Sequence, residues 1–246
     1  MKFALISDIH ANAEALEAVL ADIKTKQVDE IICLGDIVGY GANPNECIEL
    51  VKKSCSLVLL GNHDAAAVGL LSTQHFNIHA KIAIDWTEAN LQDTGKAYLK
   101  TLPLKENKNS NTLTLVHATP YEPNMWYYIT SLEEAAFNFQ FFETSFCFVG
   151  HTHIPIIIVL EHEKEVYVHQ GETLDYSGLD NVRFLINVGS VGQPRDRNSK
   201  SCYGIIDSDA KTFTYHRVAY DVQKAQAKMR KIKMPEFLIT RLEEGR

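Results

Sequence analysis

Short apolar runs that end in the same few polar residues recur along this chain. The clearest is the run at 57–60, which Gly61-Asn62-His63-Asp64 follows directly. A short apolar run stopped by glycine is typical of a buried strand that ends in a tight turn. A turn does not need an amide, an imidazole and a carboxylate in succession. Four other apolar runs end in similar side chains: Asp8 and His10, then Asp36, then His117, then His151 and His153.

Strand alternating with helix in the first sixty residues predicts an α/β fold. The predicted strands are 2–6, 30–34 and 57–60. A helix capped by Asn12 runs to about 26, and a second begins at Asn43-Pro44 and ends near 53, because asparagine is a preferred N-cap and proline is favoured at the first helical position. Such units predict parallel strands joined by right-handed crossovers.

Residues 64–102 are predicted to form a helical insert beside these strands, and 105–111 a polar loop. Ser131 and Glu134 form a capping box at the start of a helix over 131–142. The remaining predicted elements are helices at 65–71, 80–91, 94–102, 221–233 and 235–242, and strands at 112–116, 146–149, 156–160, 166–169, 184–187, 203–207 and 212–218.

The later strands lack long helices between them, which predicts a second sheet of antiparallel hairpins. We therefore expect one α/β domain over 1–246, in which two mixed β-sheets pack face to face and are flanked by helices.

Composition narrows the class of protein. The 246 residues are 46% hydrophobic and 22% charged, which is ordinary globular composition. The net charge of -7 and the lack of a basic tract argue against a stable nucleic-acid complex and against a DNA exonuclease. Five scattered cysteines indicate reduced thiols. Polar residues interrupt the N-terminal apolar run, and the longest run, 154–160, is too short to span a bilayer. We expect a cytoplasmic protein without membrane contact.

The polar strand ends are predicted to meet at one site, because ligands in open α/β sheets bind outside the carboxyl ends of the strands. Taken singly, Asp8 with His10 also fits an ordinary turn, and His117 also fits a hydrogen-bonded core histidine. His151 and His153 would repel each other if both were charged. A shared dinuclear metal centre would resolve that, although a pair of surface histidines is the alternative.

Read together, the motifs D-x-H, G-D, G-N-H-D, H and G-H-T-H make the chain resemble the calcineurin-like metallophosphoesterases over almost its whole length. The resemblance implies the metallophosphoesterase β-sandwich and a metal-dependent phosphoric ester hydrolase. It implies two divalent metal ions with these ligands: Asp8, His10 and His153 for the first, Asn62, His117 and His151 for the second, and Asp36 as the bridge. A set of imidazole nitrogens and carboxylate oxygens suits Mn²⁺, with Fe or Zn²⁺ as alternatives.

The resemblance also implies that metal-bound hydroxide attacks phosphorus. His63 would be the catalytic residue that stabilises the transferring phosphoryl group or protonates the leaving oxygen. Asn62 and His63 would contact the substrate. Asp64 either orients the His63 imidazole or caps a helix.

Two further segments bear on the substrate. The stretch from Asn187 to Asp196 resembles the N-x-G-S-x-G-x-P-R segment of the branch that includes relatives of the diadenosine tetraphosphate hydrolases. Arg195 is accordingly a candidate phosphate anchor, with a surface ion pair as the alternative. The G-D-I-V-G-Y-G stretch at 35–41 departs from the G-D-x-x-D-R-G of protein Ser/Thr phosphatases. Trp126-Tyr127-Tyr128 could stack a nucleobase or pack against the core.

The expected activity is hydrolysis of a small phosphorylated molecule, a nucleotide or dinucleoside polyphosphate. The alternatives are a general phosphodiesterase or phosphomonoesterase, or a non-catalytic interaction scaffold. The oligomeric state does not follow from the sequence.

Overall fold

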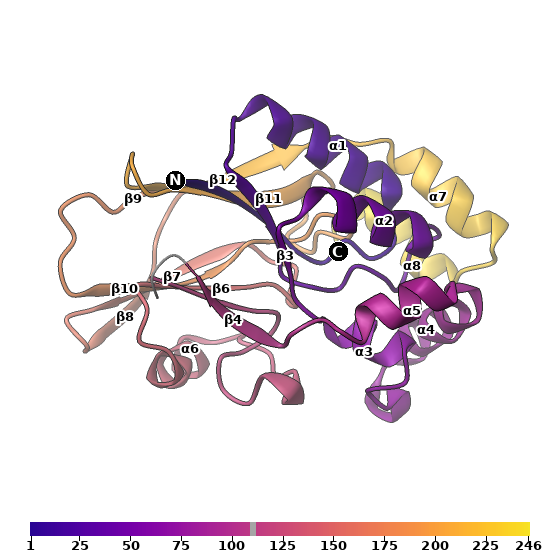
Figure 1. Ribbon diagram of the computed structural model, residues 1–246, viewed down its shortest axis with the longest axis horizontal. Helices are drawn as coiled ribbons and strands as arrows, with labels where there is room; N and C mark the ends of the chain where they lie inside the picture. Colours follow the sequence, from indigo (N-terminus) through magenta and orange to yellow (C-terminus); the bar gives the residue numbers. More distant parts are fainter. Residues whose placement is uncertain (109–111) are drawn as a thin grey trace.

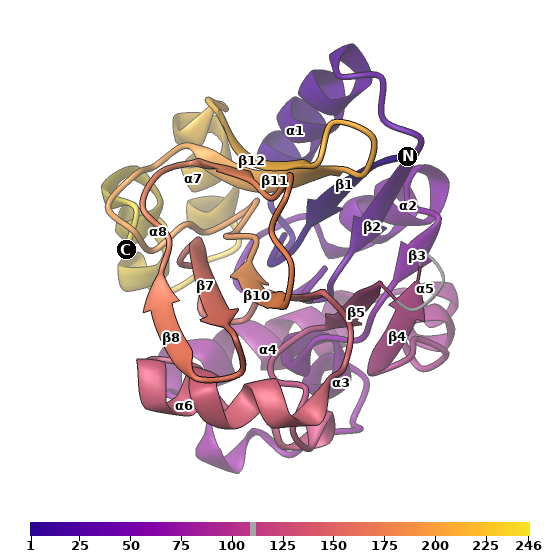
Figure 2. The same ribbon diagram turned by 90° about the vertical axis from the view of Figure 1, so that its left-hand side faces the viewer.

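The computed structural model describes residues 1–108 and 112–246, which form two six-stranded mixed β-sheets packed face to face (Figures 1 and 2). The first sheet has the strand order β3-β2-β1-β11-β12-β9. Its strands are β1 (Lys2–Ile6), β2 (Glu30–Cys33), β3 (Leu57–Val58), β9 (Thr173–Asp175), β11 (Ser201–Asp207) and β12 (Thr212–Val218).

The second sheet has the order β4-β5-β6-β10-β7-β8. Its strands are β4 (Lys105–Lys108), β5 (Leu113–Val116), β6 (Phe146–Val149), β7 (Ile156–Glu161), β8 (Glu165–Val168) and β10 (Val182–Asn187). The predicted α/β fold of two face-to-face mixed sheets flanked by helices is confirmed.

Successive side chains along each strand point to opposite faces of the sheet, so alternate residues enter the core between the two sheets. Phe3 and Leu5 of β1 point between the sheets, where they join a core with Leu115 of β5 and Phe148 of β6. The neighbouring residues of β1 point the other way and pack under helices α1 (Ala13–Thr25) and α2 (Pro44–Ser54). In Figure 1 these two helices and α7 (Val222–Lys231) cover the outer face of the first sheet.

Helices also surround the carboxyl ends of the strands. The insert contains α3 (Asn62–Ala67), the 3-10 turn η1 (Thr73–His75), α4 (Ile78–Asn90) and α5 (Asp93–Leu99). The C-terminal helix α8 (Glu236–Glu244) packs beside α4 and α7. On the outer face of the second sheet lie α6 (Leu132–Asn138) and the turn η3 (Phe139–Phe141), which follow the turn η2 (Pro123–Met125).

The strand pairing differs from the prediction in one respect. The expectation that the strands after 146–149 form a sheet of their own is wrong, because β9, β11 and β12 belong to the first sheet. β1 pairs with β2 in parallel on one side and with β11 antiparallel on the other. β1 is central and buried on both faces, so its backbone hydrogen-bonds to a neighbouring strand at each edge. The order of the strands in the sequence does not reveal that the second neighbour is β11.

The predicted polar loop at 105–111 is wrong for its first part. Residues 105–108 form edge strand β4, paired antiparallel with β5, and 109–111 lie outside the described residues. A polar sequence suits an edge strand, since one side of it faces solvent. The short strand β9 was not predicted. Other predicted elements occur with shifted ends, and the Ser131–Glu134 capping box is present.

Within the described residues, no helix is both long and apolar enough to cross a membrane.

Candidate metal centre

The seven predicted metal ligands lie together, at the carboxyl ends of five strands. Asp8 and His10 follow β1, Asp36 follows β2, Asn62 follows β3, His117 follows β5, and His151 and His153 follow β6. None of these side chains is more than 6% exposed. Their ligand atoms form groups that could each hold a metal ion, with all atoms of a group within 4.8 Å of one another: Asp8, His10 and His153; Asp36, His117 and His151; and His10, Asp36 and His63.

The backbone at these strand ends is unusual. Asp8, His10, Asp36, His151 and His153 have φ angles between 50° and 66°, in the left-handed region that residues with a Cβ rarely adopt. Such conformations cost of order 1–3 kcal/mol each and cluster at functional sites, where the surroundings impose them.

Two motif glycines allow the chain segments to approach each other. A Cβ on Gly61 would lie 2.1 Å from Asp36 Oδ1, and a Cβ on Gly150 would lie 2.0 Å from Ser7 Oγ and 2.5 Å from Asp8 Oδ2. Both glycines are therefore required by close contact with a candidate ligand or its neighbour. This explains why glycine precedes the polar residues of two motifs.

In the first group, backbone carbonyls orient the imidazoles. His10 Nδ1 donates to the Val38 carbonyl at 3.2 Å, and His153 Nδ1 donates to the Gln193 carbonyl at 2.6 Å. Their Nε2 atoms face each other at 3.0 Å. Burial lowers the pKa of both histidines well below the ordinary value, so each ring is neutral and presents a lone pair at Nε2.

The second group is built the same way, with one difference. His117 Nδ1 donates to the Leu34 carbonyl at 3.0 Å, which turns Nε2 toward Asn62 Oδ1 at 3.2 Å. His151 instead donates Nε2–H to the Trp126 carbonyl at 3.1 Å, and its buried Nδ1 has no partner among the described residues.

Asp36 lies between the two groups. Its Oδ2 atom is 3.6 Å from His10 Nε2 and 3.4 Å from His117 Nε2, while Oδ1 accepts the backbone N–H of His63 at 2.8 Å. Burial alone would raise the pKa of Asp36, but the surrounding imidazoles, led by His117, lower it. Burial alone would lower the pKa of His117, but the negative charge of the Asp36 carboxylate raises it to about 9.

These residues fit divalent metal ions. Facing lone pairs on His10 and His153 repel each other unless a cation lies between them, and the unpartnered Nδ1 of His151 is free to bind one. The carbonyl hydrogen bonds made by the other ring nitrogens are the contacts that commonly fix the orientation of metal-binding histidines. Asp36, with an oxygen near a histidine of each group, has the position required of a bridge.

His63 lies against the ligand groups at the mouth of the site. Its ring packs near His10, Tyr40 and Phe76, with centroids 4.9, 4.4 and 5.3 Å apart. A Cβ on Gly39 would lie 2.6 Å from His63 Nδ1, and this nitrogen has no hydrogen-bond partner in the described part of the chain. Burial lowers the pKa of His63 to about 4, so the imidazole is neutral near pH 7.

The prediction that Asp64 is the N-cap residue is wrong, although its carboxylate takes part in the cap of α3, and within the described residues it makes no hydrogen bond with His63. It is the third residue of α3, and Gly61 is the N-cap. Its buried carboxylate accepts the N–H groups of Gly61 and Val38, at 3.1 and 3.0 Å. Asp64 thereby joins the loop that carries Asp36 to the turn that carries Asn62.

Arg195 lies beside the centre, and within the described residues it forms no ion pair with a carboxylate. Its guanidinium carbon is 5.9 Å from the centre of the Tyr40 ring. Its Nε and Nη2 atoms donate to Gln193 Oε1 at 3.3 and 2.9 Å. The alternative of a surface ion pair therefore does not apply.

No role was predicted for two residues that contact candidate ligands, Tyr40 and Gln193. Tyr40 packs on His10, with ring centroids 4.6 Å apart, and Gln193 holds both His153 and Arg195. Tyr40 lies in the G-D-I-V-G-Y-G stretch and Gln193 in the N-x-G-S-x-G-x-P-R segment. Their places in these two motifs were the only sequence features that pointed to a role near the site. His75, also without a predicted role, lines the adjoining cavity.

The aromatic run at 126–128 is not packed into the core. Tyr127 and Tyr128 are 44% and 52% exposed. The Tyr128 ring stacks on His151 with centroids 4.0 Å apart, and Tyr127 stacks on Tyr121 at 6.0 Å. Trp126 lies edge-on to His117. These rings therefore flank the candidate centre.

Several known proteins are similar to this chain. A model of the calcineurin-like phosphoesterase superfamily domain matches residues 1–211. The uncharacterized protein MJ0912 of Methanocaldococcus jannaschii is 42% identical over 247 residues, covering 99% of this chain and 98% of that protein. A metallophosphoesterase crystal structure from Sphaerobacter thermophilus is 43% identical with a TM-score of 0.87, covering 100% of both chains. Protein PH1004 of Pyrococcus horikoshii shares the fold at 19% identity and a TM-score of 0.79, covering 100% of this chain and 98% of its own.

The resemblance found in the motifs is confirmed by the family model, which spans most of the chain, and by two relatives above 40% identity. The chain belongs to the calcineurin-like phosphoesterase superfamily and is a metal-dependent phosphoric ester hydrolase.

Proposed function

We propose that the enzyme hydrolyses a nucleotide or dinucleoside polyphosphate. The observation that carries this proposal is an aromatic cavity of about 540 Å³ that opens onto the candidate metal centre. Its lining includes Asn62, His63 and His151 from the centre, so a ligand in the cavity reaches the reacting group. Binding sites for small molecules commonly have volumes of about 300–1,000 Å³ and apolar walls with a few polar groups.

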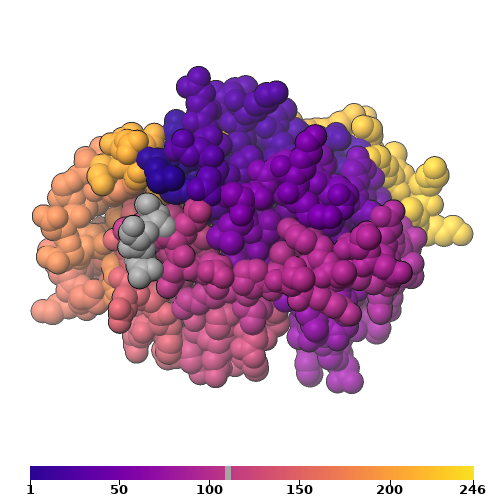
Figure 3. Space-filling view, viewed as in Figure 1, coloured from indigo at the N-terminus to yellow at the C-terminus, as the bar shows by residue number. Residues whose placement is uncertain are grey.

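The walls of this cavity suit a planar base. Its lining includes Tyr40 from the loop after β2, Phe76 from the insert, and Trp126 and Tyr128 from the segment that precedes α6. In Figure 3 the purple insert and the rose-coloured surface of the 120–140 segment stand side by side along the lower edge, with a notch between them. Stacking of a base on an aromatic ring contributes about 1–3 kcal/mol in single-strand binders.

The residues of the chain have distinct tasks in this proposal. Asp8, His10, Asp36, Asn62, His117, His151 and His153 would hold two divalent ions, for which we propose Mn²⁺ because of the nitrogen and oxygen ligands. When bound, such ions activate water and stabilise charge on the phosphoryl oxygens. The Arg195 guanidinium would hold a phosphate oxygen, and Gln193 would orient that guanidinium.

His63 would act on the phosphoryl group or on the leaving oxygen. Its pKa of about 4 makes the ring neutral, so it would give an N–H hydrogen bond to a phosphoryl or leaving oxygen without first carrying a charge. Tyr40 and Phe76 pack against the ring and restrict its orientation.

The test is a panel of three substrates with protein that has been chelated and then loaded with Mn²⁺, Fe²⁺ or Zn²⁺. The panel contains diadenosine tetraphosphate, bis(4-nitrophenyl) phosphate and 4-nitrophenyl phosphate. We expect the highest kcat/KM for diadenosine tetraphosphate. Preference for either chromogenic compound would replace the proposal with a general phosphodiesterase or phosphomonoesterase.

We also propose that the protein works in the cytoplasm. All five cysteines are free thiols, and four of them are buried. Burial raises the pKa of the Cys33 and Cys147 thiols, which makes them poor nucleophiles and suits a reducing compartment. Fractionation of the source cells, with detection of the protein by antibody, would test the location.

A further inference from the structure

A second aromatic cavity borders the one proposed to hold a base, which we call the first aromatic cavity. The second has a volume of about 490 Å³, within the range of binding sites for small molecules. Tyr128 lines both cavities, and its ring stacks on the candidate ligand His151. The second aromatic cavity is therefore one side chain away from the candidate metal centre. Its lining includes four aromatic residues: Tyr121, Tyr127, Tyr128 and Phe137.

The rings of the second aromatic cavity are held in place although they face solvent. Phe137 is 44% exposed, and its ring centroid lies 5.0 Å from that of Tyr121. Thr119 Oγ1 donates to the Tyr121 carbonyl at 2.8 Å, and the Tyr121 N–H donates to Asn138 Oδ1 at 3.4 Å. A contiguous group of exposed apolar side chains marks a surface that binds a ligand or a partner.

The charge of this cavity decides which part of a nucleotide it suits. Its lining includes the exposed residues Glu133 and Glu134 of α6, and among the described residues it includes no lysine, arginine or histidine. Carboxylates repel phosphate oxygens. They accept hydrogen bonds from N–H donors such as the amino group of adenine, guanine or cytosine. Aromatic faces beside carboxylates therefore favour a base over a phosphate.

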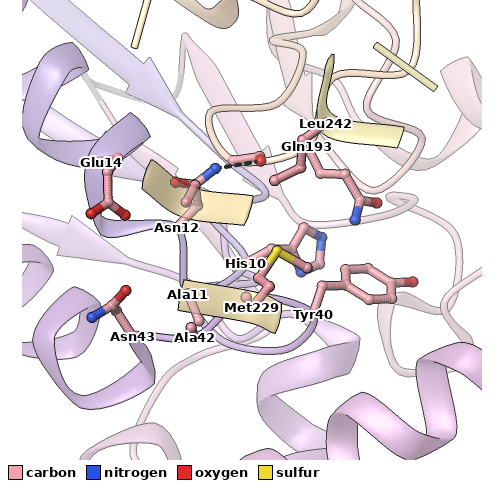
Figure 4. A pocket seen from close by; sticks show the side chains of 13 residues that line it. His10, Ala11, Asn12, Glu14, Tyr40, Ala42, Asn43, Gln193, Met229 and Leu242 are labelled. Atoms are coloured by element: carbon pink, nitrogen blue, oxygen red, sulfur yellow. Dashed lines mark hydrogen bonds between the residues drawn. The ribbon is translucent and has the colours of Figure 1, made fainter. Parts of the chain in front are cut away.

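The small cavity drawn in Figure 4 also borders the first aromatic cavity, because Tyr40 lines both. His10 and Gln193 contribute to its walls as well. Its volume is about 10 Å³, which is the space of a single water molecule. A base does not fit there. Of these two neighbours of the first aromatic cavity, the second aromatic cavity is the one with room for a further base.

We infer that the second aromatic cavity binds the second base of a dinucleoside polyphosphate. One base would lie in the first aromatic cavity, the phosphates at the metal centre, and the other base against Tyr121 and Phe137, beyond the Tyr128 ring. The inference rests on the proposed function and narrows its substrate class to two nucleosides joined by a polyphosphate chain. A mononucleotide would leave the second aromatic cavity empty and bind less tightly.

The variant that tests this site is Phe137→Ala, since Phe137 lines the second aromatic cavity alone. Leu132→Ala is the matched control, because Leu132 lies on the same helix, is 39% exposed and does not line the cavity. Both changes are made in His63→Ala protein loaded with Mn²⁺, whose slow turnover allows binding to be measured. Calorimetric titration gives the Kd of diadenosine tetraphosphate and of ATP.

We expect diadenosine tetraphosphate to bind about 5- to 100-fold more tightly than ATP, which corresponds to one additional stacked base. Phe137→Ala should remove this difference by raising the Kd of diadenosine tetraphosphate alone. Leu132→Ala should leave both Kd values within about twofold. Equal Kd values for the two nucleotides before Phe137 is replaced, or a difference that persists in Phe137→Ala, would overturn the second base site.

A second variant guards against an effect of Phe137→Ala on the folding of α6. Tyr127→Ala removes another exposed ring of the same cavity and lies outside this helix, so it should change the two Kd values in the same way. Weaker binding of both nucleotides to Tyr127→Ala would contradict the site. A dimer in light scattering that dissociates in both variants would assign the exposed rings to a second copy of the chain instead.

Because binding is measured without turnover, this inference and the proposed function can fail separately. Tight binding of diadenosine tetraphosphate that depends on Phe137, without hydrolysis by the wild type, would refute the proposed function and leave the second base site in place. Hydrolysis of diadenosine tetraphosphate with an unchanged KM in Phe137→Ala would refute the second base site alone.

Discussion

The Asp8 carboxylate accepts the backbone N–H of His151, with distances of 3.1 Å to Oδ1 and 3.0 Å to Oδ2. This bond joins the end of β1 in the first sheet to the end of β6 in the second, across 143 residues of sequence. The candidate metal centre therefore forms only when both sheets are in place. Asp36 lies close to a histidine of each ligand group, His10 in the first and His117 in the second, so its replacement should affect both metal positions.

Replacing Asp36 tests the bridge. Its Oδ2 lies near His10 of one group and His117 of the other, so Asp36→Ala should empty both metal positions and abolish turnover. Metal content measured by mass spectrometry after Mn²⁺ loading checks this result. Asp209→Ala is a matched control, because it removes an exposed carboxylate far from the centre. Full metal occupancy in Asp36→Ala would contradict the bridging role.

Replacing His63 separates turnover from metal binding. The His63→Ala variant should lose about 10²- to 10³-fold in kcat, the usual cost of removing one hydrogen-bond donor that stabilises charge in the transition state. Its metal content should stay close to that of wild type, because the seven other residues remain. His63 also lies within reach of His10 and Asp36. Loss of metal in this variant would show that His63 is a ligand instead.

The sequence predicted most of the fold because apolar runs and caps such as Asn12 are local signals. It also predicted which residues end the strands, and those residues lie together in the structure. It could not show that β11 pairs with β1, or that a polar segment forms edge strand β4, since both depend on distant partners. The left-handed backbone at Asp8 and the stacking of Arg195 on Tyr40 likewise arise only in the folded chain.

Metal loading should release protons. The pKa of His117 is about 9 beside Asp36, so this histidine is protonated at pH 7, and a metal ligand must be neutral. Burial raises the pKa of Asp8 to about 7, so this carboxyl is partly protonated as well. We expect release of about one to two protons per chain at pH 7, and apparent metal affinity that rises with pH until about pH 9.

Calorimetric titration in buffers of different ionisation enthalpy measures this release. At pH 9.5 the release should fall toward zero, because His117 and Asp8 have already lost their protons. An identical heat in every buffer at pH 7 would contradict the assignment of these residues as ligands.

Tyr128 should contribute to nucleotide binding. Its ring is half-exposed and stacks on His151 at the cavity wall. Tyr128→Ala should raise KM for diadenosine tetraphosphate by about 5- to 100-fold, which corresponds to the loss of one stacked base. Tyr167→Ala removes a similarly exposed tyrosine from β8 and serves as the control. An unchanged KM in Tyr128→Ala would exclude base stacking at this ring.

The account depends most on a pair of divalent ions held by side chains from five strand ends. The most direct measurement titrates Mn²⁺ into chelated protein and follows both bound metal and hydrolysis of bis(4-nitrophenyl) phosphate. We predict no activity before addition and full activity once about two ions are bound per chain. Full activity in the chelated protein, or saturation with a single bound ion, would contradict the dinuclear centre.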